Sequence, residues 1–156
     1  MKLYHGSTID IERIDLTMSK PNKDFGRAFY LSEDEQQALE MAQFRAEFED
    51  TNPVVNVYQF DEKLFQEFHY KRFEGYTEEW AHFVYDHRVE PQGLTLHDYD
   101  IVYGPIADDR IGAQITRFKQ GYITFDEFLR RIQYIKGITF QYAFCTQRAI
   151  DKLQKL

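Results

Sequence analysis

Two short segments near the N-terminus constrain the fold most: Leu3-Tyr4-His5-Gly6-Ser7 and Phe25-Gly26-Arg27-Ala28-Phe29-Tyr30-Leu31-Ser32. If each is an extended strand, successive side chains point to opposite faces. Phe29 and Leu31 then share an apolar face, and Tyr30 points the other way. The chain is therefore expected to place His5 and Tyr30 on two short strands of a sheet structure.

These residues have the chemistry to hold a flat ligand that carries an amide. Gly6 lets such a ligand approach the backbone closely, so that its N–H and C=O are available. His5 and Ser7 add polar side chains at the end of the strand, and Tyr30 offers a flat ring with a polar tip. The alternative is that the aromatic residues belong to the core and that His5 is a structural histidine.

A third strand is predicted over residues 138–145. Four apolar side chains fall on one of its faces: Ile138, Phe140, Tyr142 and Phe144. Gln141 therefore projects from the opposite face.

Together, the first two segments resemble the first two signature motifs of the ADP-ribosyltransferase superfamily, in its His-Tyr-Glu branch of diphtheria-toxin-like and poly(ADP-ribose) polymerase-like enzymes. Residues 5–7 resemble the first motif. Residues 25–30 resemble the Phe-Gly-x-Gly-x-Tyr element, with Ala28 in place of the second glycine. The branch has a glutamate on a strand near the C-terminus, where this chain has Gln141.

The resemblance implies a fold of split antiparallel sheets with surrounding helices and NAD, as substrate, in a central cleft. His5 would bond the adenosine-side ribose, the Gly6 backbone would hold the nicotinamide carboxamide, and Tyr30 would stack on the nicotinamide ring. Ser7 and Gly26 complete the cofactor-binding set. His5, Tyr30 and Gln141 would form the catalytic set, and no metal is implied.

Gln141 leaves the activity open. Cleavage of the nicotinamide–ribose bond develops positive charge on the sugar, and a carboxylate near the 2-hydroxyl lowers that barrier. An amide can bond the hydroxyl but carries no charge. The hypotheses are a mono-ADP-ribosyltransferase acting on a protein or nucleic-acid acceptor, an NAD glycohydrolase, and an inactive NAD-binding or protein-interaction module. Four carboxylates are candidates to compensate: Glu33, Glu35, Asp108 and Asp109.

A second resemblance covers nearly the whole chain. With the opening and closing motifs, the run of residues 99–109 is similar to a bacterial family known only as a domain of unknown function. That family resembles ADP-ribosyltransferases in fold, and its genes often lie near suspected toxin–antitoxin genes, which implies an antitoxin protein as a partner. Asp108 or Asp109 would either cap the next helix or bind substrate or cofactor.

Composition limits the class of protein. A chain of 156 residues suits one domain, residues 1–156. The formal net charge is −7 without a basic run, which argues against an extended nucleic-acid surface but leaves a local nucleic-acid substrate open. The single cysteine, Cys145, fits a reducing compartment. Since no apolar run approaches the ~20 residues of a membrane span, a soluble cytoplasmic protein without a membrane partner is expected.

Helices are predicted between the strands. A capping box of Ser32 and Glu35 opens a helix to about Glu49. Its apolar side comprises Ala38, Leu39, Met41, Ala42 and Phe44. Thr77 is expected to cap a helix to about Arg88. Strands are predicted over residues 54–60 and 99–103.

Three further helices are predicted towards the C-terminus. One carries Ile111, Ile115 and Phe118 at helical spacing. The next follows a capping box of Thr124 and Glu127, with an apolar stripe of Phe125, Phe128, Leu129, Ile132 and Ile135. The last begins near Thr146, with Ala149, Ile150, Leu153 and Leu156 inward. Because strands and helices do not alternate regularly, the fold class is α+β.

The histidines do not predict a metal site. His82 and Asp86 lie four residues apart on a predicted helix, but no further pair completes a set of ligands. His69, His87 and His97 are expected at the surface.

Overall fold

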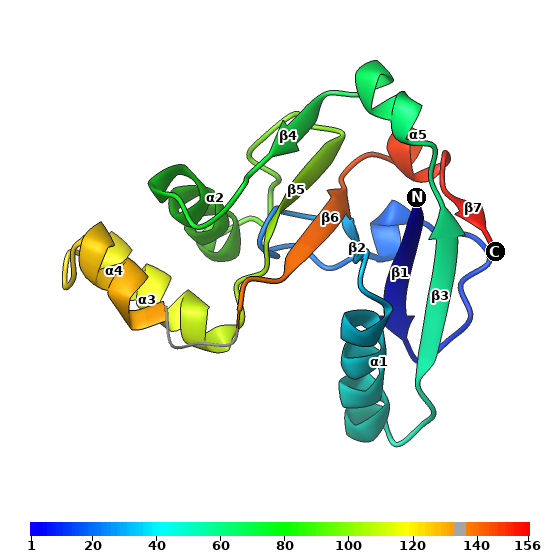
Figure 1. Ribbon diagram of the computed structural model, residues 1–156, viewed down its shortest axis with the longest axis horizontal. Helices are drawn as coiled ribbons and strands as arrows, with labels where there is room; N and C mark the ends of the chain where they lie inside the picture. The colour runs from blue at the N-terminus through cyan, green and yellow to red at the C-terminus, as the bar shows by residue number, and fades with distance from the viewer. Residues whose placement is uncertain (133–136) are drawn as a thin grey trace.

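The computed structural model describes residues 1–132 and 137–156. The chain forms two β-sheets with α-helices around them (Figure 1), which confirms the predicted α+β class. The strands are β1 (Lys2–Ser7), β2 (Phe29–Leu31), β3 (Val54–Gln59), β4 (Tyr70–Arg72), β5 (Ile101–Pro105), β6 (Phe140–Phe144) and β7 (Gln154–Lys155). The α-helices are α1 (Glu35–Glu49), α2 (Glu78–Val89), α3 (Asp109–Lys119), α4 (Phe125–Ile132) and α5 (Gln147–Ile150), and short 3-10 helices occupy Leu16–Met18 and Glu62–Glu67.

The first sheet has the strand order β1-β3-β7, and both of its pairings are antiparallel. Helix α1 packs on β1 and β3. The contact is close because Gly6 has no side chain: a Cβ at this position would lie 2.1 Å from the carbonyl oxygen of Ala38. A glycine at position 6 is therefore required by the packing of α1 on β1.

Helix α1 confirms its predicted length and part of its predicted apolar side, Ala38 and Ala42, but not its predicted cap. The N-cap is Asp34, whose side chain accepts from the N–H groups of Gln36 and Gln37, and Ser32 lies too far upstream to serve. The buried face consists of small residues, Ala38, Ala42 and Ala46. Two of the residues predicted inward are wrong, because Met41 is 51% exposed and Phe44 is 70% exposed. Only alanines fit the close approach to Gly6.

The second sheet has the strand order β2-β6-β5-β4, in which only β4 and β5 run parallel. The predicted faces of β2 and β6 are confirmed. Four side chains enter one core cluster on one face: Phe29, Leu31, Tyr142 and Phe144. The side chains of Ala28 and Tyr30 pack in the cluster on the other face. Strand β6 begins at Phe140, so Ile138 lies before the strand and is exposed.

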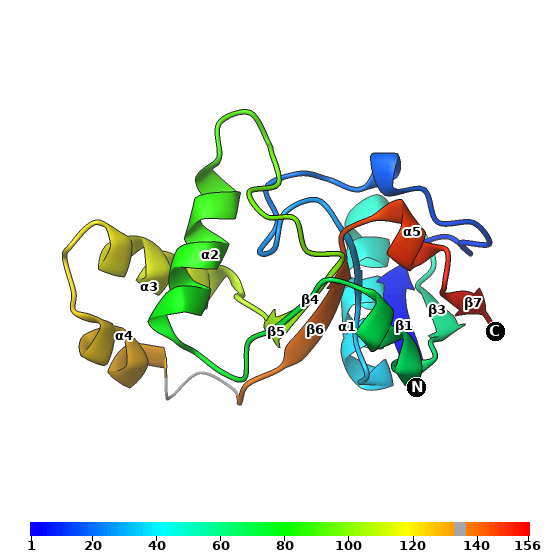
Figure 2. The same ribbon diagram turned by 90° about the horizontal axis from the view of Figure 1, so that it is seen from above.

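The helical part of the molecule covers one face of the second sheet. Helices α2, α3 and α4 lie at the opposite end of the molecule from β1 and β3 in both views (Figures 1 and 2). Their inward side chains complete the cluster that contains Tyr30: Trp80, Ala81, Val84, Ile111, Ile115 and Phe128. No helix in the described part of the chain is long and apolar enough to span a membrane.

The predicted first residues of the later helices agree with the structure, but the predicted extent of the last helix does not. Thr77 caps α2 and Thr146 caps α5, and the Thr124 hydroxyl accepts from the N–H of Glu127 at the start of α4. Helix α5 is short, and the chain then forms β7, so Leu156 is exposed rather than inward. Ile135 lies outside the described residues.

The prediction of surface histidines is wrong for His87, which is 2% exposed. Its Nδ1 donates to the carbonyl of Phe83, and its Nε2 accepts from the N–H of Leu96. His97 is partly buried. Its Nε2 donates to the carbonyl of Phe25, and its Nδ1 accepts from the N–H of Tyr99. His87 therefore fastens the loop of residues 90–99 to α2, and His97 fastens it to Phe25 in the segment that leads into β2.

Candidate functional site

Strands β1 and β2 are joined by a single backbone bridge, and this bridge links the two sheets. The N–H of Tyr4 donates to the carbonyl of Ser32 over 2.8 Å, and the N–H of Ser32 donates to the carbonyl of Tyr4 over 2.9 Å. Two residues further along each antiparallel strand, Gly6 would face Tyr30 and exchange the next pair of hydrogen bonds. That exchange does not occur among the described residues, so the pairing stops after one bridge.

The imidazole of His5 bonds the carbonyl of Tyr30, to which the N–H of Gly6 would donate in a continuous ladder. Its Nδ1 lies 2.7 Å from the carbonyl oxygen of Tyr30. Since a carbonyl only accepts, Nδ1 carries the proton. The ring also stacks on Phe29, with 4.3 Å between the ring centroids. The carbonyl that Gly6 would bond in a continuous sheet is thus occupied by a side chain.

Burial keeps His5 neutral. It lowers the pKa of the imidazole to about 4, against the opposing effect of the Tyr30 carbonyl, and the charges of Arg45 and Lys155 lower it further. The neutral ring then has a lone pair on Nε2. No buried side-chain nitrogen or oxygen in the described chain lacks a partner, and the only hydrogen bond of the ring is through Nδ1. Nε2 is therefore an acceptor that solvent or a ligand can reach.

The backbone of Gly6 presents a donor and an acceptor at the same edge. Because backbone groups of alternate residues point to the same side of a strand, the N–H and C=O of Gly6 point to the side on which Tyr4 bonds Ser32. No hydrogen bond found outside the ladders of residues 1–132 and 137–156 uses these two groups. Gly6 is buried, and buried backbone groups nearly always have partners. This edge is suited to a ligand with a paired donor and acceptor.

The side chain of Tyr30 shapes the preceding loop. Its hydroxyl donates to the carbonyl of Gly26 over 2.7 Å and accepts from the N–H of Phe25 over 3.0 Å. Gly26 has a φ of 86°, a conformation that side chains disfavour. Burial raises the pKa of Tyr30 well above its ordinary value. The tyrosine is therefore neutral and locked to the loop of residues 25–30.

Gln141 projects from the same face of the second sheet as Tyr30, as predicted. Strands β2 and β6 pair Tyr30 with Ala143, and Gln141 lies two residues before Ala143 on that face. The Nε2 of Gln141 donates to Oδ2 of Asp24 over 3.2 Å. Since a carboxylate only accepts, this bond fixes the amide orientation and directs Oε1 away from Asp24 as an acceptor.

Asp24 is the site residue that the sequence did not reveal. It is 8% exposed, and it accepts from Arg88 Nε over 2.8 Å, from the Ala107 N–H over 3.0 Å and from Gln141. Arg88 also donates to the carbonyl of Ala107. The negative charge of Asp24 is thus fully engaged, and the carboxylate is not a free base.

The four carboxylates considered as substitutes lie elsewhere, and none bonds Gln141 in the described structure. Glu33 accepts from the Tyr142 hydroxyl, on the opposite face of β6. Asp108 caps α3 through the N–H of Ile111 over 2.8 Å, which confirms the cap that was one of its two predicted roles. Asp109 and Glu35 are the first residues of α3 and α1.

The side chains of the predicted catalytic residues do not converge on one another. His5 stacks on Phe29, whose side chain points to the opposite face of β2 from that of Tyr30. Ser7 is buried and accepts a 3.4 Å bond from the N–H of Ile9. Gln141 contacts Asp24 rather than Tyr30. The structure brings His5 and Gly6 together with the backbone of Tyr30, and places Gln141 at a neighbouring position.

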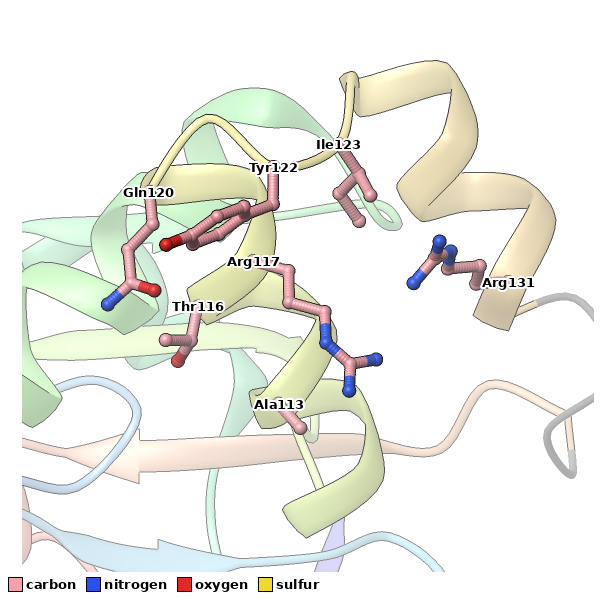
Figure 3. A pocket seen from close by; sticks show the side chains of 7 residues that line it. All are labelled: Ala113, Thr116, Arg117, Gln120, Tyr122, Ile123 and Arg131. Atoms are coloured by element: carbon pink, nitrogen blue, oxygen red, sulfur yellow. The ribbon is translucent and has the colours of Figure 1, made fainter.

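The pockets at the helical end are separate from these residues. One, of about 610 Å³, lies along α3, the loop that follows it and the C-terminal end of α4 (Figure 3). It is lined by Ala113, Thr116, Arg117, Gln120, Tyr122, Ile123 and Arg131. A neighbouring pocket of about 210 Å³ lies between α2 and α3. Neither includes His5, Gly6, Tyr30 or Gln141.

The described residues contain no group of three or more side chains suited to holding a metal ion. His82 and Asp86, the pair considered as metal ligands, both contact the side chain of a lysine instead. Lys119 Nζ lies 2.8 Å from Nδ1 of His82 and 3.5 Å from Oδ1 of Asp86.

The sequence matches the family described as "Protein of unknown function (DUF3990)" over residues 1–155. The chain belongs to this family. The match agrees with the resemblance of the whole chain to a domain of unknown function. No curated protein and no solved structure matches the DUF3990 chain significantly.

Proposed function

We propose that the chain binds NAD and transfers a single ADP-ribose unit from it to a protein or nucleic-acid acceptor, in an ADP-ribosyltransferase-like fold whose two sheets part around the cofactor. The observation that carries the proposal is the interrupted pairing of β1 and β2. It leaves the N–H and C=O of Gly6 without a strand partner beside His5 and Tyr30.

The chemistry of the nicotinamide end of NAD matches this edge. A carboxamide has an N–H donor and a carbonyl acceptor, which pair with the C=O and N–H of Gly6. The Nε2 of His5 accepts from a ribose hydroxyl, as the family resemblance implies. Tyr30 contributes its ring for stacking. The neutral state of His5 supports this role, because a protonated ring would offer no acceptor.

In the proposed reaction the bond between the nicotinamide nitrogen and the ribose carbon breaks, and nicotinamide leaves with the bonding electron pair as a neutral molecule. The acceptor's nucleophile then forms a bond to that carbon and loses its proton to solvent or to a base. Gln141 Oε1 accepts from a ribose hydroxyl but adds no charge. Transfer of one unit is favoured over chain elongation, since the resemblance assigns activation of the next hydroxyl to the missing carboxylate.

The second candidate is a catalytically weak or inactive module that binds NAD or a protein partner. The bond from Gln141 to Asp24 favours it, because Asp24 is already paired with Arg88 and has no charge to lend. The family resemblance supports a toxin role with an antitoxin partner for the active form.

Calorimetric titration with NAD, followed by incubation of labelled NAD with cell lysate, tests the proposal. Binding with transfer of label to a macromolecule supports the transferase. Binding without release of nicotinamide supports the inactive module, and release without transfer indicates a glycohydrolase. Absence of NAD binding by the folded chain would overturn the NAD-dependent forms of both candidates.

A further inference from the structure

Helix α1 carries a stripe of large apolar side chains that face solvent. Met41 is 51% exposed, Phe44 is 70% exposed and Phe48 is 88% exposed. Residues at this spacing of three and four fall on one side of a helix. The helix packs on β1 and β3 through the alanines of its other side. Figure 1 shows α1 with the first sheet along one of its sides only. We call these three residues the α1 stripe.

The stripe is not needed for the packing of α1. The close approach of Ala38 and Ala42 to Gly6 already seats the helix on the sheet. Burial of a phenylalanine side chain is favourable, and Phe44 and Phe48 forgo most of this stabilisation in the isolated chain. A partner that covers the stripe would recover it.

The flank of the stripe is acidic. Glu40 and Glu47 each precede a stripe residue by one position, so both lie along the same edge of it. Both are exposed, and within the described chain neither forms an ion pair. Arg45 lies on the other side of the stripe and is partly buried. A complementary surface would have an apolar strip bordered on one side by lysine or arginine.

These charges disfavour other occupants. In an antiparallel pair of α1 helices from two copies, equivalent flanks meet, so Glu40 and Glu47 would face the same two residues of the second copy. Such like-charge contacts are unfavourable. An anionic membrane surface or a nucleic acid would likewise be repelled by this flank and by the net charge of −7.

We infer that the α1 stripe is the docking face for an amphipathic helix of another protein, which seats apolar residues on Met41, Phe44 and Phe48 and places basic residues opposite Glu40 and Glu47. This is a helix packed along a helix, with anchors at the same three- and four-residue spacing. The inference goes beyond the proposed function and does not depend on NAD binding.

Two designed helical peptides test it. They share one leucine stripe and are long enough to span α1; one has lysine on the flank and the other has glutamate. In fluorescence anisotropy, the lysine peptide is expected to bind the chain and the glutamate peptide is not. Combined Phe44→Ser and Phe48→Ser should weaken binding by about tenfold or more, since much apolar contact is lost. Combined Glu40→Lys and Glu47→Lys should reverse the preference between the peptides.

Met18→Ser is the matched control, because Met18 is 82% exposed and lies outside α1; it should bind the lysine peptide as the unaltered chain does. Circular dichroism and thermal melting confirm that each variant is folded. Binding that ignores the two phenylalanines, or that is equal for both peptides, would overturn the inference. So would a dimer in sedimentation, or binding to anionic vesicles, that Phe44→Ser with Phe48→Ser abolishes.

Discussion

The β1–β2 junction differs from the hydrogen-bond network of Asp24, Arg88, Ala107 and Gln141, which we call the Asp24 network. The difference is whether the polar groups have partners. At the junction, Gly6 presents a backbone donor and acceptor without a strand partner, and His5 keeps a free acceptor. Both carboxylate oxygens of Asp24 are engaged, Oδ1 by Arg88 and Oδ2 by Ala107 and Gln141. The first region is suited to receive a ligand, and the second is suited to hold the fold together.

The contrast separates binding from catalysis. Among the groups proposed to hold NAD, the backbone of Gly6 and Nε2 of His5 have no hydrogen-bond partner in the described chain. Gln141, where the resemblance to the His-Tyr-Glu enzymes places their glutamate, bonds the ion pair of Asp24 and Arg88 instead. The chain therefore has stronger structural support for binding than for bond cleavage, and the variants below test each region separately.

Gly6→Ala should have the largest effect on the free energy of unfolding. The new Cβ would lie 2.1 Å from the carbonyl oxygen of Ala38 and 2.8 Å from the nitrogen of Ala42, both backbone atoms, so α1 must move off β1. We expect a loss of about 4 kcal/mol in the free energy of unfolding, above the ordinary range for overpacking. Urea denaturation followed by circular dichroism measures it. Gly75→Ala is the control, because nothing lies within 4 Å of its Cβ position. Equal midpoints for the two variants would contradict the tight contact.

Asp24→Ala should cause the second-largest loss in the free energy of unfolding. It leaves Arg88 without its carboxylate, and the N–H of Ala107 and the amide of Gln141 without an acceptor. Loss of one partner of a largely buried pair costs about 3 kcal/mol. Asp98→Ala is the matched control, because the Asp98 side chain is 88% exposed and its one ion pair within residues 1–132 and 137–156 is with His69; its effect should be within about 0.5 kcal/mol. A small effect of Asp24→Ala would mean that the network is not structural.

Local patterns predicted β1, β2, β3, β5 and β6 and the faces of β2 and β6, but not β4, β7 or the contacts between distant segments. Alternation placed Phe29 and Leu31 opposite Tyr30, and a β-strand has few other ways to arrange them. The apolar side of α1 was predicted correctly for Ala38 and Ala42 and wrongly for Met41 and Phe44, since hydrophobicity alone favours the large side chains, whereas the close contact with Gly6 is made by small ones.

The residues of the candidate site that belong to local motifs were predictable, and the contacts between distant residues were not. His5, Gly6 and Tyr30 follow from two local motifs. The bond between Asp24 and Gln141 joins residues 117 positions apart, and that between Asp24 and Arg88 spans 64. Neither carries a spacing signal in the sequence. Ser32 and Asp34 are both good helix caps, and only the backbone geometry of the structure decides between them.

The pH dependence of stability should report on His5. Its pKa is about 4 in the folded chain and near 6.5 when unfolded, so the unfolded chain binds more protons between these values. The stability that His5 contributes is therefore complete above pH 6.5 and is lost as the pH falls towards 4, by about 3 kcal/mol. His87 and His97, whose pKa values burial also lowers, act in the same direction. His5→Gln removes only the first contribution, so urea midpoints from pH 7 to pH 4 should fall less steeply. Parallel curves would contradict the buried neutral imidazole.

Gln141→Glu should change catalysis more than stability. It supplies the carboxylate that the family resemblance expects, but beside Asp24, where a bond of 3.2 Å now holds the amide. Two carboxylates so close repel, so we expect a cost of about 1 kcal/mol in stability. NAD affinity should be retained, because Gly6, His5 and Tyr30 are unchanged, and release of nicotinamide should rise. Tyr30→Ala is the counterpart, since it should weaken NAD binding by about fivefold through lost stacking. If Gln141→Glu leaves release unchanged while NAD still binds, the Asp24 network prevents the new carboxylate from reaching the ribose, and the chain is a binding module rather than an enzyme.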